Sequence, residues 1–194
     1  MYTVIGSANT RTLRVLWLLE ELGLPYTHIP AAPQSAAARA HNPAGKVPTL
    51  IDGAASITDS TAIVTYLADK HGAFTAPAGT LPRAQQDSVT HFLLDEFDAL
   101  LWTSARHSFV LPEDMRMPAI KTSLKWEYAR NLSRLSARLK GPYLMGDQMT
   151  VPDILAAQCL SWGLAAKFPS PDGALADYLT MLRARPAYLR ASVR

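Results

Sequence analysis

The sequence predicts an α/β domain followed by an all-helical (all-α) domain, and three observations lead to this fold class. The first third of the chain reads as short β-type runs and helices in the order β-α-β, a loop, then β-β-α. After residues 73–81, which are rich in Ala, Pro and Gly, the β-type runs stop and helical periodicity takes over. The 194 residues can fill two compact domains, which we expect at 1–74 and 82–194.

The elements of the first domain follow from local patterns. Helices are expected at residues 11–22, where Gly23 is a fitting stop, and at 59–70, closed by Gly72. The alanine-rich stretch near Ala36 is expected to be a loop. Strands are expected at 2–5, 26–29, 47–52 and 56–58, the last two in a hairpin-like spacing.

The second domain shows apolar residues at helical spacing. They predict long helices around 89–101 and 120–139, with prolines in the turn between them. Thr150 and Asp153 have the spacing of a capping box, so a helix is expected to start there. The run that follows is apolar nearly all round, which predicts a helix at the centre of this domain. A final amphipathic helix is expected around 175–182, interrupted by Pro186.

Composition excludes several classes of protein. The first residues lack the pattern of a signal peptide, and no apolar run approaches the ~18 residues of a membrane span, so we expect a cytoplasmic protein without membrane contact. The net charge of +3 comes from scattered residues, which disfavours nucleic acid as a partner. The single cysteine, Cys159, excludes a multi-cysteine zinc site and a Cys-x-x-Cys redox motif; we expect it to be buried, and we expect no metal.

The turn between the first strand and the first helix carries polar groups that suit an anion. Ser7 and Thr10 supply hydroxyls and Asn9 an amide, next to a helix N-terminus, where free N–H groups and the helix dipole favour negative charge. A thiolate is such an anion, and its pKa falls in this setting. The alternative is that these residues only cap the helix.

Two further segments have a similar character. A cis Val47-Pro48 bond would present the main chain of Val47 to a peptide bound as an extra strand. At the next helix start, the hydroxyl and N–H groups around Ser60 suit a carboxylate, and Asp59 suits an ammonium group. Taken singly, this segment is also explained as a helix cap.

Together these segments resemble one family. Residues 14–26 (RVLWLLEELGLPY), 42–50 (NPAGKVPTL) and 59–67 (DSTAIVTYL) are similar to signature segments of the cytosolic glutathione transferases. Residues 142–147 (PYLMGD) with 150–153 (TVPD) resemble the capping motif of that family's helical domain, and 185–188 (RPAY) its C-terminal turn. The resemblance looks closest to bacterial members with a serine or cysteine type of site, and it implies a thioredoxin-like first domain.

The resemblance implies a binding role for several residues. Val47, before Pro48, would pair with the cysteinyl main chain of glutathione. Ser60 would bind the γ-glutamyl carboxylate, and Asp59, where the family usually has Glu or Gln, would lie near the ammonium group. Lys46 would bind the glycyl carboxylate, unless it is simply solvated.

The resemblance also implies a group that activates the thiol. We favour Thr10, which stands where relatives have a serine, with Ser7 as the second candidate and Asn9 and Arg11 in support. Trp102 and Arg106 are candidates for lining the site of the second substrate, expected between the domains.

The implied activity is that of a homodimeric transferase with glutathione as co-substrate. It would conjugate glutathione to a hydrophobic electrophile or reduce an organic peroxide. The alternative is a protein of the same fold that binds ligands or regulates a partner without turnover. Acceptor sites vary within one fold, so the sequence does not name the electrophile.

Overall fold

The computed structural model describes residues 1–194, and its fold class confirms the prediction of an α/β domain followed by helices. The chain forms two compact units, one made of Met1–Thr80 with Leu182–Arg194 and the other of Leu81–Met181. None of the helices combines the length and the apolar character needed to cross a membrane.

A four-stranded sheet organises the first unit. Its strands are β1 (Tyr2–Ile5), β2 (Tyr26–Ile29), β3 (Thr49–Asp52) and β4 (Ala55–Thr58), in the order β2-β1-β3-β4. β1 and β2 are parallel, whereas β1–β3 and β3–β4 are antiparallel. The predicted strands are confirmed, with the third beginning at Thr49 because the preceding proline has no N–H to donate to a ladder.

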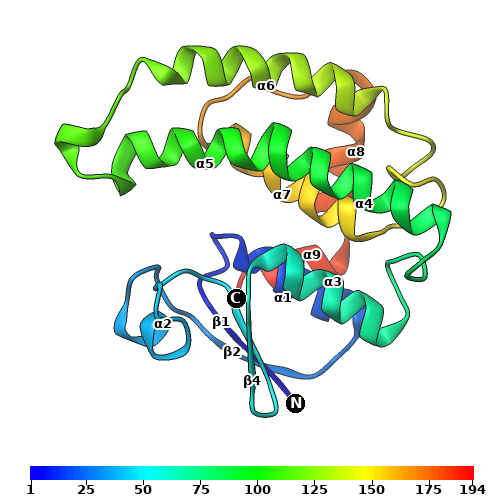
Figure 1. The fold of residues 1–194 in the computed structure, drawn as a ribbon. Helices are drawn as coiled ribbons and strands as arrows, with labels where there is room; N and C mark the ends of the chain where they lie inside the picture. Colours follow the sequence, from blue (N-terminus) through cyan, green and yellow to red (C-terminus); the bar gives the residue numbers. More distant parts are fainter. The chain divides into compact units, whose positions relative to one another are not determined.

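Both faces of this sheet are covered. Val4 and Leu50 are opposite each other in the register and fully buried. Ile5 points to the other face, where it packs with Ala31 and Ala38. The helices α1 (Thr12–Leu22) and α3 (Ser60–His71) pack side by side, and α2 (Ala36–His41) lies apart from them (Figure 1).

The prediction of a loop near Ala36 was wrong, because this stretch is the helix α2. Its sequence, AAARAH, consists mostly of alanine, which has the highest helix propensity. Ser35 caps it by accepting a hydrogen bond from the Ala38 N–H, 3.2 Å away, and Ala38 is buried against the sheet. A six-residue helix with one buried apolar position is too short to show a helical period in the sequence.

The second unit is helical throughout, as predicted. Its longest continuous segment contains α4 (Leu81–Leu93), the π-helical η1 (Leu94–Asp98), α5 (Ala99–Ala105) and the π-helical η2 (Arg106–Val110). A short 3₁₀ turn, η3 (Glu113–Met115), leads to α6 (Ile120–Ser136). The long helices predicted from periodicity are therefore confirmed, and the π-helical turns are an addition that periodicity did not show.

The helix α7 (Val151–Ala165) is the core of this unit. Its residues 151–160 are all buried, which confirms the prediction of a central helix. Cys159 is 1% exposed, as expected. The capping box of Thr150 and Asp153 is present at its start.

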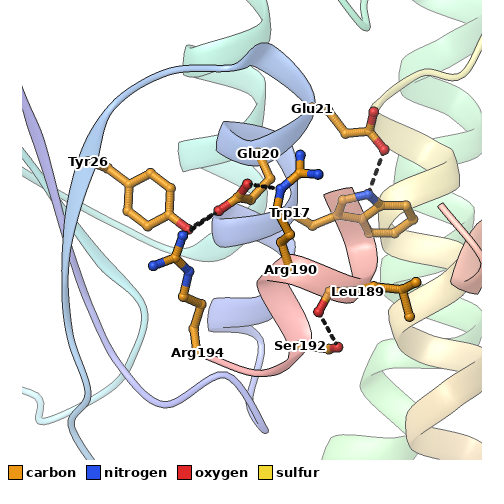
Figure 2. Close-up of polar contacts among 8 residues, drawn as sticks. All are labelled: Trp17, Glu20, Glu21, Tyr26, Leu189, Arg190, Ser192 and Arg194. Atoms are coloured by element: carbon orange, nitrogen blue, oxygen red, sulfur yellow. Dashed lines mark hydrogen bonds and ion pairs between the residues drawn. The ribbon is translucent and has the colours of Figure 1, made fainter. Parts of the chain in front are cut away.

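The C-terminal residues return to the first unit after α8 (Gly173–Arg183). The short helix α9 (Pro186–Ser192) packs against α1, where the rings of Trp17 and Tyr188 meet edge to face at 5.1 Å. Glu20 pairs with Arg190 at 2.6 Å and with Arg194 at 2.9 Å (Figure 2). These contacts explain why Leu182–Arg194 group with the first unit although they are last in the chain.

Candidate functional site

The three predicted binding segments leave the sheet at the same end. Ile5 of β1 lies opposite Thr49 of β3, and Thr49 lies opposite Thr58 of β4. The residues after Ile5, before Thr49 and after Thr58 therefore emerge at one end of three neighbouring strands. This places together three segments that are distant in sequence: 6–11, 46–48 and 59–60.

Gly6 allows the first two segments to approach each other closely. It is buried and has φ of 138°, a conformation that other residues rarely adopt. A Cβ at this position would lie 2.2 Å from the Thr12 hydroxyl oxygen and 2.9 Å from the Val47 Cβ. The turn after β1 is thus packed between the start of α1 and Val47, and only glycine fits there.

The hydroxyls of Ser7 and Thr10 both donate to main-chain carbonyls. Ser7 donates to the carbonyl of Ala31 at 3.0 Å, and Thr10 donates to that of Ser7 at 2.7 Å. Each hydroxyl has a single hydrogen, so either one must rotate before it can donate to a bound sulfur atom. Both side chains are half-buried and lie in the turn between β1 and α1.

Thr10 differs from Ser7 in what its oxygen accepts. The Thr12 N–H donates to it at 3.1 Å, and the Thr12 hydroxyl oxygen lies 2.9 Å away. Because Thr10 donates its own hydrogen to Ser7, the Thr12 hydroxyl is the donor between the two threonines. Donors to an oxygen polarise its O–H group, so Thr10 is the stronger hydrogen-bond donor of the two candidates.

The Val47-Pro48 bond is cis, the form that would present the main chain of Val47 to a bound peptide. Val47 is half-buried and packs against the cluster of Ile5, Ala31 and Ala38. Its main-chain N–H and C=O form no hydrogen bond within the chain. Both groups are therefore available to a peptide that adds alongside.

The loop before Val47 is held by Asn42. This buried side chain donates to the Lys46 carbonyl at 3.0 Å and accepts from the Ala44 N–H at 3.1 Å. The Lys46 side chain is exposed. Asn42 was within the quoted motif but was not a predicted site residue, and its contribution is to shape this loop.

Asp59 adopts an unusual conformation at the start of α3. Its φ of 72° costs a residue other than glycine about 1–3 kcal/mol, a type of strain found mainly at functional sites. Its Oδ1 caps the helix by accepting from the N–H groups of Thr61 at 2.9 Å and Ala62 at 3.0 Å. Both bonds use the same oxygen, so the exposed carboxylate keeps Oδ2 for a ligand.

Ser60 is buried next to a buried arginine. Arg14 is 1% exposed and donates from Nη1 to the Ser60 Oγ at 3.2 Å. A guanidinium has no acceptor, so Ser60 must accept, and the serine hydrogen points elsewhere. Because Ser60 accepts from Arg14, its own hydrogen remains available to donate to a ligand at the N-terminus of α3, where a carboxylate is favoured.

Arg14 and Thr12 are the residues that sequence reasoning missed. Arg14 counted only as one of the few polar positions of the first helix, and Thr12 received no role. The available signal was an arginine between apolar neighbours on the face that packs inward, where a charge requires a partner. Asn9 is exposed and Arg11 half-buried in the same turn.

Trp102 and Arg106 lie in the second unit, one helical turn apart at the junction of α5 and η2. Both are half-buried. Arg106 donates from Nη2 to the Thr103 hydroxyl at 3.1 Å, and its buried Nε has no hydrogen-bond partner. A buried N–H without a partner suits a ligand that carries an acceptor.

Comparison with known domain families gives two consecutive matches. Residues 1–79 match the family described as glutathione S-transferase, N-terminal domain. Residues 104–186 match the family described as glutathione S-transferase, C-terminal domain.

Solved structures with a similar fold cover nearly the whole chain. A theta class glutathione S-transferase from Xanthomonas axonopodis pv. citri, with glutathione bound, is 30% identical with a TM-score of 0.79, over 100% of this chain and 97% of that chain. A glutathione transferase from Methylococcus capsulatus is 25% identical with a TM-score of 0.82, over 100% and 98%. One from Phanerochaete chrysosporium, in complex with oxidized glutathione, is 25% identical with a TM-score of 0.78, over 98% and 94%.

Proposed function

Because this chain belongs to the glutathione S-transferase family, we propose that it binds glutathione at the end of the sheet where residues 6–11, 46–48 and 59–60 meet. It then activates the thiol for attack on a hydrophobic electrophile or for reduction of an organic peroxide. The observation that carries this proposal is the strand register: Ile5, Thr49 and Thr58 lie opposite one another on neighbouring strands, which brings the three segments to one end of the sheet.

The backbone of glutathione binds as an extra strand beside Val47, whose N–H and C=O have no other partner. Pro48 removes one competing donor at this position. The γ-glutamyl carboxylate accepts from the Ser60 hydroxyl, which Arg14 orients as a donor. The ammonium group binds the free Oδ2 of Asp59.

The remaining polar residues act at the other parts of the ligand. Lys46 binds the glycyl carboxylate from its exposed position. Thr10 donates to the sulfur after its hydroxyl rotates away from the Ser7 carbonyl, while Thr12 continues to donate to it. Ser7 is the alternative donor, and Asn9 and Arg11 add polar groups around the same sulfur.

The reaction then needs no covalent intermediate with the protein. The thiol proton leaves to water, and the thiolate sulfur forms a bond to an electrophilic carbon. With an aryl halide the halide departs with its electron pair, whereas an unsaturated carbonyl loses no group and takes up a proton from water. With an organic peroxide, two glutathione molecules are oxidised to the disulfide while the peroxide is reduced to an alcohol and water. Positioning and stabilisation of the thiolate are the contributions of the protein, and Trp102 and Arg106 contact the second substrate.

Calorimetry and turnover together test this proposal. The wild-type chain should bind glutathione at millimolar concentration and should turn over members of a panel of aryl halides, unsaturated carbonyls and organic peroxides. Absence of binding would refute the whole proposal. Binding without turnover of any compound, with a bound thiol pKa equal to that of free glutathione, would instead favour the non-catalytic alternative.

One observation favours the non-catalytic alternative. Both candidate hydroxyls already donate to carbonyls, so thiolate stabilisation requires a rearrangement of one of them. The alternative predicts that this rearrangement does not occur on binding. Ultraviolet absorbance of the bound thiolate between pH 5 and 10 measures the difference.

From the family membership we also propose that the protein is a homodimer located in the cytoplasm. The dimer is tested separately from the activity. A two-fold symmetric pair is the commonest form of oligomer. Light scattering at micromolar concentration should give about twice the chain mass of 21.1 kDa. A mass equal to that of one chain would contradict the dimer and leave the glutathione site unaffected.

A further inference from the structure

Positive charge in the helical unit is concentrated on α6 and the residues that follow it. Residues 120–140 contain six Lys or Arg and one Glu, whereas the rest of 81–181 contains four Lys or Arg and ten Asp or Glu. α6 runs along one edge of this unit, where it packs against α5 and η1 (Figure 1). None of the residues assigned above to glutathione or to the second substrate belongs to α6, so the proposed function leaves this charge without a role.

The outward face of α6 carries an exposed tryptophan. Trp126 is 65% exposed, and the guanidinium of Arg130 lies over its ring, 5.3 Å from the centroid. Leu124, Tyr128 and Leu132 are buried on the opposite side of the helix. The outer side of the Trp126 ring is therefore apolar area that the chain itself leaves in contact with water.

Cations lie along both edges of this outward face. Arg130 and Arg134 are one turn apart on one edge, and Lys121 and Lys125 are one turn apart on the other. The exposed residues between the two edges are small and uncharged, namely Thr122, Ala129 and Ser133. A flat anionic surface can thus approach the helix closely and meet cations on both sides.

The two arginines are only loosely held by the protein. They lie 3.6 Å and 4.0 Å from the one carboxylate of Glu96, both beyond hydrogen-bond distance. Each also donates to the Asn131 Oδ1, at 3.4 Å, which is long for a hydrogen bond. Because one carboxylate is shared by two guanidinium groups, the cluster of Arg130, Arg134 and Glu96 keeps a net positive charge.

An apolar tip, residues 109–117, leads into α6. Five of the eleven large apolar side chains exposed in the whole chain lie in this tip or on α6: Phe109, Val110, Met115, Met117 and Trp126. Polar groups hold the turn together, since Arg116 Nε donates to the Leu111 carbonyl at 2.8 Å and the Met117 N–H donates to His107 Nδ1 at 3.1 Å. The tip contains one arginine and two acidic residues, so it contributes apolar area while α6 contributes the positive charge.

We propose that the outward face of α6 and the apolar tip attach the protein to the surface of an anionic lipid bilayer. Several Lys and Arg side chains near such a surface each add to the attraction. Trp126 and the side chains of the tip enter the headgroup region, where amphipathic rings are favoured. A nucleic acid would also satisfy the cations, but it offers no hydrocarbon for Val110, Met115 and Met117.

This proposal differs from the expectation of no membrane contact. That expectation rested on the lack of an apolar run long enough to span a bilayer, and a protein attached to the surface needs no such run. The sequence does show the cations of residues 120–140, but their placement along the two edges of an exposed face follows from the folded chain.

Co-sedimentation of the full chain with vesicles tests this attachment. The wild type should bind vesicles of equal parts phosphatidylglycerol and phosphatidylcholine about tenfold more tightly than vesicles of phosphatidylcholine alone. Higher salt should reduce this difference, because it screens the exposed cations.

Two double variants with the same loss of charge locate the surface. Arg130→Gln with Arg134→Gln should weaken binding to the mixed vesicles about tenfold. Arg39→Gln with Arg183→Gln removes two exposed arginines of the other unit and should bind within about twofold of the wild type. Far-ultraviolet circular dichroism verifies that both variants are folded. Equal binding by the wild type and the Arg130→Gln, Arg134→Gln variant would overturn the proposal.

The apolar part of the surface has its own test. Trp126→Phe should remove most of the blue shift in tryptophan fluorescence on the mixed vesicles, and Phe109→Ser with Met117→Ser should weaken binding to them. Unchanged binding by the Phe109→Ser, Met117→Ser variant would overturn the proposal. So would displacement of the vesicles by a single-stranded oligonucleotide at equal charge concentration, which would assign the face to nucleic acid. Self-association of the wild type that is lost in Arg130→Gln with Arg134→Gln, without vesicle binding, would assign it to a second copy of the chain.

Discussion

Asp59 and Asp153 perform the same local task at two helix starts, and their surroundings give them different functions. Asp59 caps α3 through Oδ1 alone, is exposed, and has a positive φ. Asp153 belongs to the capping box of α7 and is fully buried. Asp59 keeps an oxygen for a ligand, so the comparison shows that unused hydrogen-bonding capacity and exposure distinguish a candidate binding residue from a structural cap.

The Asp153 carboxylate is saturated by the protein itself. Oδ1 accepts from the Leu144 N–H at 2.9 Å and the Tyr178 hydroxyl at 2.7 Å, and Oδ2 from the Thr150 N–H at 2.7 Å and its hydroxyl at 3.1 Å. Burial raises the pKa of Asp153, while the N–H groups of Leu144 and Thr150 lower it. The carboxylate joins α7 to α8 and to the preceding loop, so its role is structural.

The largest expected effect is that of Asp153→Asn. The new NH₂ group would face buried donors at one of the two oxygen positions, leaving groups unpaired. We expect the free energy of unfolding to fall by about 3 kcal/mol, as for other disrupted buried networks. Urea denaturation measures this loss. The control is Asp147→Asn, at an exposed aspartate of the same loop, which should change the free energy of unfolding by less than about 0.5 kcal/mol. A loss below about 1 kcal/mol would contradict the structural role.

Ser60→Ala should act on the ligand more than on the fold. We expect glutathione binding to weaken by about 1.5–3 kcal/mol, because a hydrogen bond to a charged carboxylate is lost. Calorimetry measures the affinity. Ser56→Ala, which removes an exposed hydroxyl on β4, should leave that affinity unchanged. Equal affinities of wild type and Ser60→Ala would remove Ser60 from the site.

Arg14→Met should weaken glutathione binding through Ser60. If Arg14 orients the Ser60 hydroxyl, the two substitutions share one interaction, and their effects on binding should not add. We expect a coupling free energy of about 1 kcal/mol, within the range for side chains in contact. A double-mutant cycle of Arg14→Met and Ser60→Ala, measured on folded proteins, provides this value. Additive effects would show that Arg14 contributes by charge or packing alone.

Thr10→Ala should raise the pKa of the bound thiol by about one unit, which corresponds to one hydrogen bond to the thiolate, and should leave glutathione affinity nearly unchanged. Ser7→Ala should have a smaller effect, because its oxygen is not polarised by Thr12. Titration of the thiolate absorbance compares the two variants. The reverse order would identify Ser7 as the activating group, and no shift in either would exclude both hydroxyls.

The smallest effect is expected for Asp59→Asn, which separates the two tasks of this residue. Asparagine can still cap α3 and tolerates a positive φ, so thermal stability should change little. The negative charge is lost, so glutathione should bind about threefold more weakly, as for an exposed ion pair. Asp59→Ala, which also removes the cap, should lower stability as well. If Asp59→Asn binds glutathione as the wild type does, Asp59 is only a cap.

The sequence by itself determined the features that depend on neighbouring residues. Alternation and turn residues located the strands, and apolar spacing located the long helices. The Thr150–Asp153 spacing located the start of α7, because a capping box involves only four consecutive residues. The composition change after residue 73 marks the boundary between the α/β part and the helical part, and the residue types of the three polar segments are recognisable without their arrangement in space.

Only the tertiary structure decided which distant groups meet. The register of β1, β3 and β4 brought the three segments to one end of the sheet. The contact between Arg14 and Ser60 joins residues 46 positions apart, and that between Glu21 and Arg185 joins residues 164 apart. Hydrogen-bond donors and acceptors are satisfied by residues this far apart in sequence, and no local sequence pattern shows which groups are paired. The sequence could therefore identify Asp59 and Asp153 as caps, but only the folded chain shows which one keeps an oxygen for a ligand.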